Sequence, residues 1–259
     1  MEESIKTEAQ FVHKQFLFLL KLPWYLLLVL FGKKSFAELF QPLRELVHFL
    51  LEPKLTIFLI VLNVGMFIYT MFFMPEETLR NLVFQPGQLS QLNFIPMIVS
   101  WFLHASIAHL LGNMFFLYIF GRILERRFGY KMLFIYFGAA VISDLFASLF
   151  AQGGIGASGA ISGLVAAAIL TDPFYITFLV FGVPIPILLL GWLSIFSDIF
   201  GVLSPEETNI GYLAHLGGYL SITLLVYFLN PEEKQRMKKG LIINLILVAV
   251  LVALYFLFK

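Results

Sequence analysis

The sequence predicts an all-α, polytopic membrane protein, and three observations lead to that class. Of the 259 residues, 60% are hydrophobic. Only 13% are charged, and the mean hydropathy is +0.90. This is far more apolar surface than a soluble domain of the same length can bury. The apolar residues also gather in long runs, as in helices that cross a hydrocarbon core of about 30 Å.

Charge and cysteine content exclude several functions. The formal net charge is +1, so the chain has no basic field to attract nucleic acid, and we expect no nucleic-acid partner. The absence of cysteine removes disulfides, thiolate nucleophiles and thiolate metal ligands. Any nucleophile must therefore be an oxygen or a nitrogen.

Seven apolar runs, bounded by charged residues or proline, are interpreted as membrane spans. They comprise residues 55–73, 107–124, 132–150, 157–170, 185–203, 212–229 and 241–258. The fourth run is short because Asp172 and Pro173 stop it. No linker is long enough for a second folded domain. We divide the chain into an N-terminal segment (1–51), a core (52–230), and a basic loop with a seventh helix (231–259).

The N-terminal segment is expected to lie on the cytoplasmic face of the membrane. Its apolar run, residues 16–31, is interrupted by Lys21 and Pro23, which favours a surface-lying or partly inserted segment over a span. Residues 36–51 alternate apolar and charged positions at helical spacing, which predicts an amphipathic helix. No small-residue cleavage site follows the early run, so the sequence does not predict a cleavable signal peptide.

The basic residues set the expected orientation. Twelve of the seventeen Lys and Arg residues fall in three clusters on one side of an alternating topology, and two fall on the other side. The positive-inside rule makes the first side cytoplasmic. The outward loops carry Glu76, Glu77, Glu206 and Glu207. We expect an integral, multi-pass protein in the plasma membrane of a prokaryote, with the membrane of an organelle as the alternative.

Polar side chains within the spans indicate a functional site, because polar groups are costly in a bilayer. They are the glycine-rich segment 153–163 around Ser158, the segment 214–218 around His215, and the triplet His104, His109 and Asn113. A rise of about 1.5 Å per residue places Ser158 and His215 roughly 21 and 22 Å above the cytoplasmic boundary. Asn113 and His109 lie roughly 20 and 25 Å above it. These four groups can therefore converge at one depth.

Small residues favour contact between the fourth and sixth spans. Gly159 and Gly163 form one face of the fourth span, and Gly217 and Gly218 lie beside His215. Because glycines let helix backbones approach, we expect the Gly159 face to pack against the sixth span. A serine at hydrogen-bond distance from a histidine is an activated nucleophile. An adjacent amide and a second histidine are suited to stabilise an oxyanion.

These residues resemble the rhomboid family of intramembrane serine proteases. The matching positions are Gly156-Ala157-Ser158-Gly159 with Gly163, Ala214-His215 with Gly218, the triplet His104, His109 and Asn113, and the segment 121–129. Together with the order of the spans, the resemblance covers residues 55–230. It implies a six-helix core, to which residues 241–258 add a seventh transmembrane helix. It also implies an endopeptidase that cleaves transmembrane proteins near their outer ends.

The resemblance implies a role for each site residue. Ser158 would be the nucleophile and His215 the general base. The oxyanion would be stabilised by Asn113, His109 and the backbone around Ser158 and Gly159. Structural support would come from His104, Gly156, Gly163 and Gly218. No cofactor or metal is implied, and the partners would be transmembrane protein substrates and the lipid bilayer.

Three positions depart from the family pattern. Ser162 stands four residues after Ser158, where the family often has an aromatic residue. The segment Ile95–Pro96 replaces a frequent Trp-Arg in the first outer loop. Ile222, next to the small Ser221, stands where a glycine is usual.

Structural alternatives accompany these roles. A serine at the start of a glycine-rich helix is commonly an N-cap or a packing residue. We expect His104 to brace the outer loop, and His109 with Asn113 has the alternative of a structural polar pair. A metal site built from His104, His109 and His215 is disfavoured because no carboxylate or cysteine completes it.

Two carboxylates inside spans, Asp144 and Asp198, admit two interpretations. We expect hydrogen bonds to neighbouring Ser, Tyr or Trp side chains, with orientation of His215 as the alternative. Two other functions are also considered: a non-catalytic rhomboid-like protein that binds or escorts membrane helices, and a transporter that uses the two carboxylates. The intact Ser158 and His215 argue against the first, and the absence of an inverted repeat argues against the second.

Overall fold

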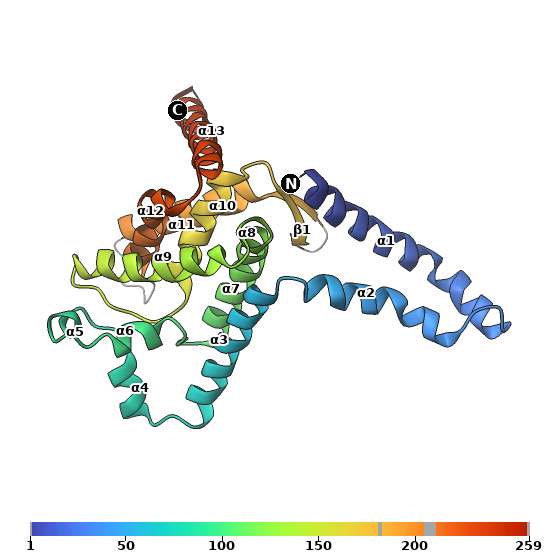
Figure 1. Cartoon of the computed structure of the whole chain (residues 1–259), viewed down its shortest axis with the longest axis horizontal. Helices are drawn as coiled ribbons and strands as arrows, with labels where there is room; N and C mark the ends of the chain where they lie inside the picture. The colour runs from blue at the N-terminus through green and yellow to red at the C-terminus, as the bar shows by residue number, and fades with distance from the viewer. Residues whose placement is uncertain (1, 181–182, 205–210, 258–259) are drawn as a thin grey trace.

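The computed structural model describes residues 2–180, 183–204 and 211–257. The regular secondary structure of the described residues is helical except for one short β-hairpin (Figure 1). The elements are α1 (Glu2–Leu30), η1 (Phe36–Phe40), α2 (Gln41–Leu50), α3 (Lys54–Phe72), α4 (Glu76–Leu82), α5 (Gly87–Ser90), α6 (Ile95–Ser100), α7 (Ile107–Phe116), η2 (Leu117–Gly121), α8 (Arg122–Phe128), α9 (Lys131–Ser148), α10 (Ser158–Thr171), β1 (Ile176–Val180), β2 (Val183–Pro186), α11 (Ile187–Leu203), α12 (Tyr212–Leu225), η3 (Val226–Phe228) and α13 (Pro231–Leu257).

The lengths of the apolar helices confirm an all-α, multi-pass membrane fold. In the described residues, five helical stretches are long and apolar enough to cross a membrane. They are residues 8–30 of α1, α3, the continuous helix 107–128, α9 and α13. Three further apolar helices, α10, α11 and α12, are shorter. Each of the seven predicted spans corresponds to one of these helices.

Helix α10 lies at the centre of the bundle. It packs against α9, α11, α12 and α13, and nearly all of its residues are buried. Its 14 residues extend only about 21 Å at about 1.5 Å per residue, less than the hydrocarbon core of about 30 Å. Because Asp172 ends the helix as predicted, Ser158 at its other end lies well inside the bundle.

Glycines set the close approach of α10 to two neighbours, α9 and α12. A Cβ atom at Gly159 would lie 2.0 Å from Ser143 Oγ, and one at Gly163 would lie 2.2 Å from Ala139 Cβ. The face of these two glycines therefore lies closest to α9. It also packs on the sixth span as predicted, because a Cβ at Gly163 would lie 3.1 Å from Ser221 Oγ and 3.3 Å from the Gly218 carbonyl oxygen. The close contact with α12 is made by Gly218, whose Cβ would lie 2.2 Å from the Gly159 carbonyl oxygen.

The glycine-rich segment before α10 is held by the loop between α3 and α7. Phe84 and Gly154 exchange two backbone hydrogen bonds, and the Gly156 N–H donates to the Ser100 carbonyl at 2.8 Å. A Cβ at Gly153 would meet the Phe84 carbonyl oxygen at 2.1 Å. The short helices α4, α5 and α6 lie in this loop and were not predicted. The hydrogen bonds of Phe84 and Ser100 hold the segment that leads to Ser158.

The end of the bundle away from Ser158, which we call the basic end, is held together by four charged residues: Arg122, Glu125, Arg126 and Arg127. Glu125 accepts hydrogen bonds from the Leu55 and Thr56 backbone N–H groups at 2.9 and 2.8 Å and thus caps α3. Arg122 is fully buried and donates to the Phe49 carbonyl oxygen and to Glu52. Arg126 pairs with Glu52, and Arg127 pairs with Asp172 and Glu233. This segment ties α2, α3, α10 and α13 together.

Helices α1 and α2 form a hairpin that extends away from the bundle (Figure 1). Its anchor is Glu8, which is 1% exposed and pairs with Arg122 and Arg126. Helix α1 continues through Lys21 and Pro23 without a break. The predicted amphipathic helix 36–51 divides into η1 and α2.

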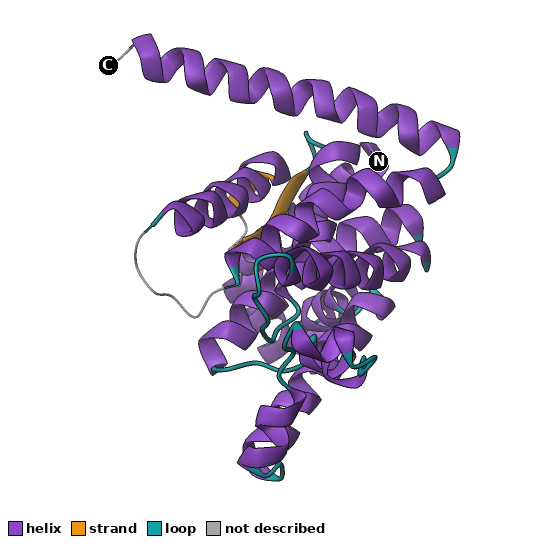
Figure 2. Ribbon diagram, turned by 90° about the vertical axis from the view of Figure 1, so that its left-hand side faces the viewer, coloured by secondary structure: helices purple, strands orange, loops and turns teal. Residues whose placement is uncertain are grey.

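Two features of the C-terminal half differ from the predictions. The segment 231–240, expected as a basic loop, is the first part of the single helix α13. Helix α13 contacts the bundle between Glu233 and Asn244, and the part after Asn244 extends past the other helices (Figure 2). The antiparallel hairpin β1–β2 was not predicted; its strands are too short to separate from the adjoining apolar run.

Candidate active site

A cavity of about 380 Å³ lies between α7 and α11, with α10 and α12 completing its wall. The residues of interest that line it are His109, Asn113, Ser158, Ser162, Ser194, Asp198 and His215. The structure thus places the predicted nucleophile, base and two oxyanion side chains around one space. These side chains come from four helices of a largely apolar bundle.

Ser158 begins α10 but does not cap it. The N-cap is Ala157, which makes no side-chain capping bond, so the N-cap interpretation of Ser158 is wrong. The first N–H groups of a helix have no partner within the helix, which leaves backbone donors beside the serine. Gly156 has φ +121°, and a Cβ there would lie 2.8 Å from His109 Nε2. Only glycine brings the chain this close to that ring.

His215, in the first turn of α12, is held by a carboxylate. Its Nδ1 lies 2.7 Å from Asp198 Oδ1 on α11. The Tyr219 hydroxyl donates to the other oxygen, Oδ2, at 2.6 Å, and Ser194 bonds the same hydroxyl at 2.8 Å. Asp198 therefore makes both of the contacts weighed from the sequence, to a tyrosine and to His215.

Nε2 is the ring nitrogen of His215 that Asp198 leaves unused. Within the described residues, no hydrogen bond joins the His215 ring to the Ser158 hydroxyl. Hydrogen bonds of catalytic groups are often long without substrate and shorten in the reacting complex. The structure thus places a serine and a histidine on one cavity without a hydrogen bond between their side chains.

The oxyanion candidates are oriented by the loop that precedes α7. Asn113 Nδ2 lies 2.9 Å from His104 Nε2. Burial lowers the pKa of His104 to about 4, so its ring is neutral at pH 7 and Nε2 can accept. A side-chain amide has two N–H donors, which leaves Asn113 a second one. The backbone of His109 is fixed by Ser106, the N-cap of α7, and its ring lies 5.0 Å from that of His104.

The departures from the family pattern have local consequences. Ser162 donates to the Ser158 carbonyl oxygen at 2.9 Å, and the aromatic neighbour of His215 is Tyr212, whose ring lies 6.4 Å away. Ser221 is fully buried and donates to the Gly218 carbonyl oxygen. Asp144, the other intramembrane carboxylate, accepts from the Trp101 indole at 2.6 Å, as expected.

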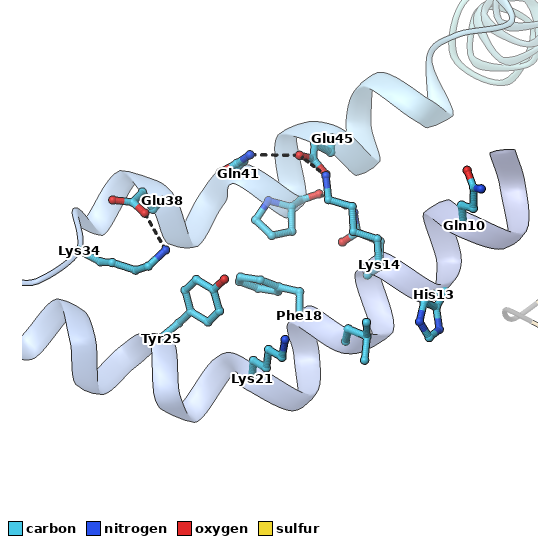
Figure 3. A pocket seen from close by; sticks show the side chains of 13 residues that line it. Gln10, His13, Lys14, Phe18, Lys21, Tyr25, Lys34, Glu38, Gln41 and Glu45 are labelled. Carbon is cyan, nitrogen blue, oxygen red and sulfur yellow. Dashed lines mark hydrogen bonds and ion pairs between the residues drawn. The ribbon is translucent and has the colours of Figure 1, made fainter.

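A second cavity, of about 400 Å³, lies between α1 and α2 (Figure 3). Four of its charged groups form two ion pairs, Lys14 with Glu45 and Lys34 with Glu38, at 2.7 and 3.0 Å. Lys34 also lies over the Tyr25 ring. No serine lines this cavity, so the space around Ser158 is the candidate active site.

The contact between Asp198 and His215 was predicted only as the less favoured alternative. Both helices carry a signal for it. Ser194 and Asp198 are four residues apart on α11, and His215 and Tyr219 are four apart on α12. Residues at this spacing lie on one helical face, so two polar pairs in adjacent apolar helices indicate a shared network.

The fold and the cavity define a multi-pass membrane protein with a polar, serine- and histidine-lined site inside its helical bundle. The family model described as Rhomboid domain matches residues 91–232, more than half of the chain. The chain therefore belongs to the rhomboid family.

Two relatives come from Arabidopsis thaliana. The chain is 29% identical to RHOMBOID-like protein 12, mitochondrial, over 181 residues, which are 62% of this chain and 54% of the relative. It is 43% identical to RHOMBOID-like protein 6, mitochondrial, over 76 residues, which are 27% of this chain and 24% of the relative. The chain thus spans about half of the first relative and about a quarter of the second.

Proposed function

We propose that the chain is an intramembrane serine endopeptidase that hydrolyses peptide bonds in or near transmembrane segments of other proteins. The observation that carries this proposal is the placement of Ser158 and His215 on one cavity, beside Asn113 and His109. Membership of the rhomboid family supports the same reaction. The proposal needs no cofactor or metal.

The reaction follows from these positions. Ser158 Oγ attacks the carbonyl carbon of the substrate while its proton passes to His215 Nε2. The carbonyl oxygen becomes an oxyanion, which accepts hydrogen bonds from Asn113, His109 and the backbone N–H groups at the start of α10. The C–N bond then breaks, and the leaving amine takes the proton from Nε2. A water molecule, activated by the same nitrogen, hydrolyses the acyl-enzyme and releases Ser158.

The substrate and its route follow from the surroundings of the cavity. Helices α7 and α11 line its two sides, so we infer that a substrate segment enters between them and that α11 with the following loop is the gate. Residues 205–210 of that loop, with Glu206 and Glu207, lie outside the described residues. Water would enter from the end opposite the basic end, which the positive-inside rule makes the outer face.

The membrane that holds the protein is a separate matter. The helices and the family establish an integral, multi-pass membrane protein. The two relatives are named as mitochondrial proteins, and they give no support to the prokaryotic plasma membrane expected from the sequence. The proposed reaction is the same in a mitochondrial membrane and in a prokaryotic plasma membrane.

The test is covalent labelling of the purified protein by a fluorophosphonate, with cleavage of a model transmembrane substrate in proteoliposomes. Wild type should react, and Ser158→Ala and His215→Ala should each lose both signals while remaining folded. Ser148→Ala is a matched control, because the Ser148 hydroxyl donates to the Asp144 carbonyl oxygen of its own helix and does not line the cavity. Equal labelling of wild type and Ser158→Ala would overturn the proposal. Substrate binding with neither labelling nor cleavage would favour the helix-binding alternative.

A further inference from the structure

The strongest unassigned feature of the molecule is the buried carboxylate of Asp198. Its side chain is 9% exposed, and that of His215 is 15% exposed. An ionised carboxylate away from water is costly unless its oxygens receive hydrogen bonds. Both oxygens are engaged, Oδ1 by His215 Nδ1 and Oδ2 by the Tyr219 hydroxyl. The network therefore specifies a carboxylate at this position of α11.

We infer that Asp198 is a positioning residue that completes a Ser158–His215–Asp198 triad across α10, α12 and α11. The inference rests on the proposed function, because orientation of His215 matters to a reaction only if His215 is the base. The hydrogen-bond partners of the Asp198 carboxylate among the described residues are His215 and Tyr219, so it would act on Ser158 through the imidazole.

The contact determines which ring nitrogen can serve as the base. A carboxylate only accepts hydrogen bonds, so its partner Nδ1 must carry the imidazole proton. The lone pair is then on Nε2, the nitrogen available to take the serine proton. When Nε2 is protonated during attack, the adjacent carboxylate also stabilises the imidazolium.

The second carboxylate of the bundle provides a matched comparison. Asp144 on α9 is also embedded among spans, but its partner is the Trp101 indole. An asparagine at either position keeps the size of the side chain and one acceptor oxygen. Asp198→Asn removes the charge next to His215 and offers Nδ1 a donor, which favours the wrong tautomer. Asp144→Asn retains the acceptor for Trp101.

Kinetics in proteoliposomes test the inference. In serine proteases with a three-membered site, the corresponding change to asparagine costs about 10⁴-fold in kcat. We expect Asp198→Asn to lower kcat by about 100- to 10⁴-fold with KM changed by less than about threefold. Asp198→Glu should recover at least about tenfold over Asp198→Asn, and Asp144→Asn should stay within about threefold of wild type. A kcat for Asp198→Asn within about threefold of wild type would overturn the inference.

A spectroscopic measurement keeps this inference separate from the proposed function. Nitrogen-15 NMR of histidine-labelled protein, with the His215 signals assigned by His215→Gln, reports the tautomer without any turnover. We expect wild-type His215 to carry its proton on Nδ1 and Asp198→Asn to lose that preference. An unchanged tautomer would refute the role of Asp198 even in an active enzyme. If the wild-type protein does not react with fluorophosphonate but His215 has the expected tautomer, the proposed function is refuted and the role of Asp198 is not.

Tyr219→Phe is the fallback if Asp198→Asn does not fold. It keeps the carboxylate and removes only the hydroxyl that donates to Oδ2. Loss of a hydrogen bond to a charged group is expected to reduce kcat by about tenfold through looser placement of His215. A wild-type kcat together with an unchanged His215 tautomer in Tyr219→Phe would count against the network.

Discussion

Substitution of Gly218 by alanine tests whether the separation of α10 and α12 controls the reaction. The new Cβ would lie 2.2 Å from the Gly159 carbonyl oxygen and 2.9 Å from Ser162 Cβ. Since Cβ contacts below 3.0 Å essentially do not occur, the two backbones must separate by about 0.8 Å. The atom met is backbone, so no side chain can rotate away.

The displacement acts on the residues that must meet. Gly159 follows Ser158, and Gly218 lies three residues after His215, so separation of their backbones moves the nucleophile from the base. A misplacement of about 1 Å can cost about 100-fold in rate, and overpacking typically costs about 1–3 kcal/mol of stability. We therefore expect Gly218→Ala to lower kcat/KM by about 10- to 100-fold and to lower the melting temperature.

The assay is fluorophosphonate labelling rate and substrate cleavage, measured beside thermal unfolding in detergent. Gly65→Ala in α3 is the matched control, because a Cβ there meets nothing within 4 Å. It makes the same change in an apolar helix and should preserve activity. If Gly218→Ala keeps the labelling rate and the melting temperature of Gly65→Ala, the close contact between α10 and α12 does not govern the site.

Three further predictions follow from the same structure. Asn113→Ala should lower kcat by about 100- to 1000-fold with little change in KM, because an oxyanion donor strengthens only as charge develops; a change confined to KM would assign the residue to structure. His104 has a folded pKa of about 4, below the unfolded value near 6.5. Folding favours the neutral form of His104, so the free energy of unfolding should fall by up to about 3 kcal/mol as the pH is lowered from 6.5 to 4. In His104→Gln, the free energy of unfolding should fall by less over the same pH range. Because the chain has no cysteine, Lys131→Cys and Glu206→Cys should react with an impermeant maleimide from opposite faces, and labelling from one face would invalidate the topology.

Much of the fold was predictable because apolar runs report spans directly. Asp172 ends α10 as the sequence indicates, and the seven runs correspond to seven helices. Helix α4 and the β1–β2 hairpin were not predictable, since they depend on contacts with the rest of the chain. The burial of Glu8 is of the same kind, because its arginine partners lie more than a hundred residues away.

The site was predictable in its composition and less so in its contacts. Spacing and depth selected Ser158, His215 and Asn113, which line one cavity. The close packing of Gly159 and Gly163 on α9 was not predicted, because a glycine pair marks a close-packing face without naming every helix that meets it. The bond between Asp198 and His215 depends on the rotation of α11 against α12, and periodicity within one helix does not determine that rotation.

The five-residue π turn of η2, between Asn113 and Arg122, constrains the length of this helix. A π turn accommodates one residue more than an α-helix of the same rise, and each residue of an α-helix advances the chain by about 100°. Deleting one residue from 117–121 would therefore regularise the hydrogen bonding and leave the two halves of the helix in nearly the same phase, whereas deleting a second residue would rotate one half against the other by about that angle. Either the Asn113 amide would then leave the cavity, or the buried Arg122 guanidinium would leave its partners. The π turn thus gives the helix one spare residue between Asn113 and Arg122, and a longer deletion disrupts one end of the molecule to preserve the other.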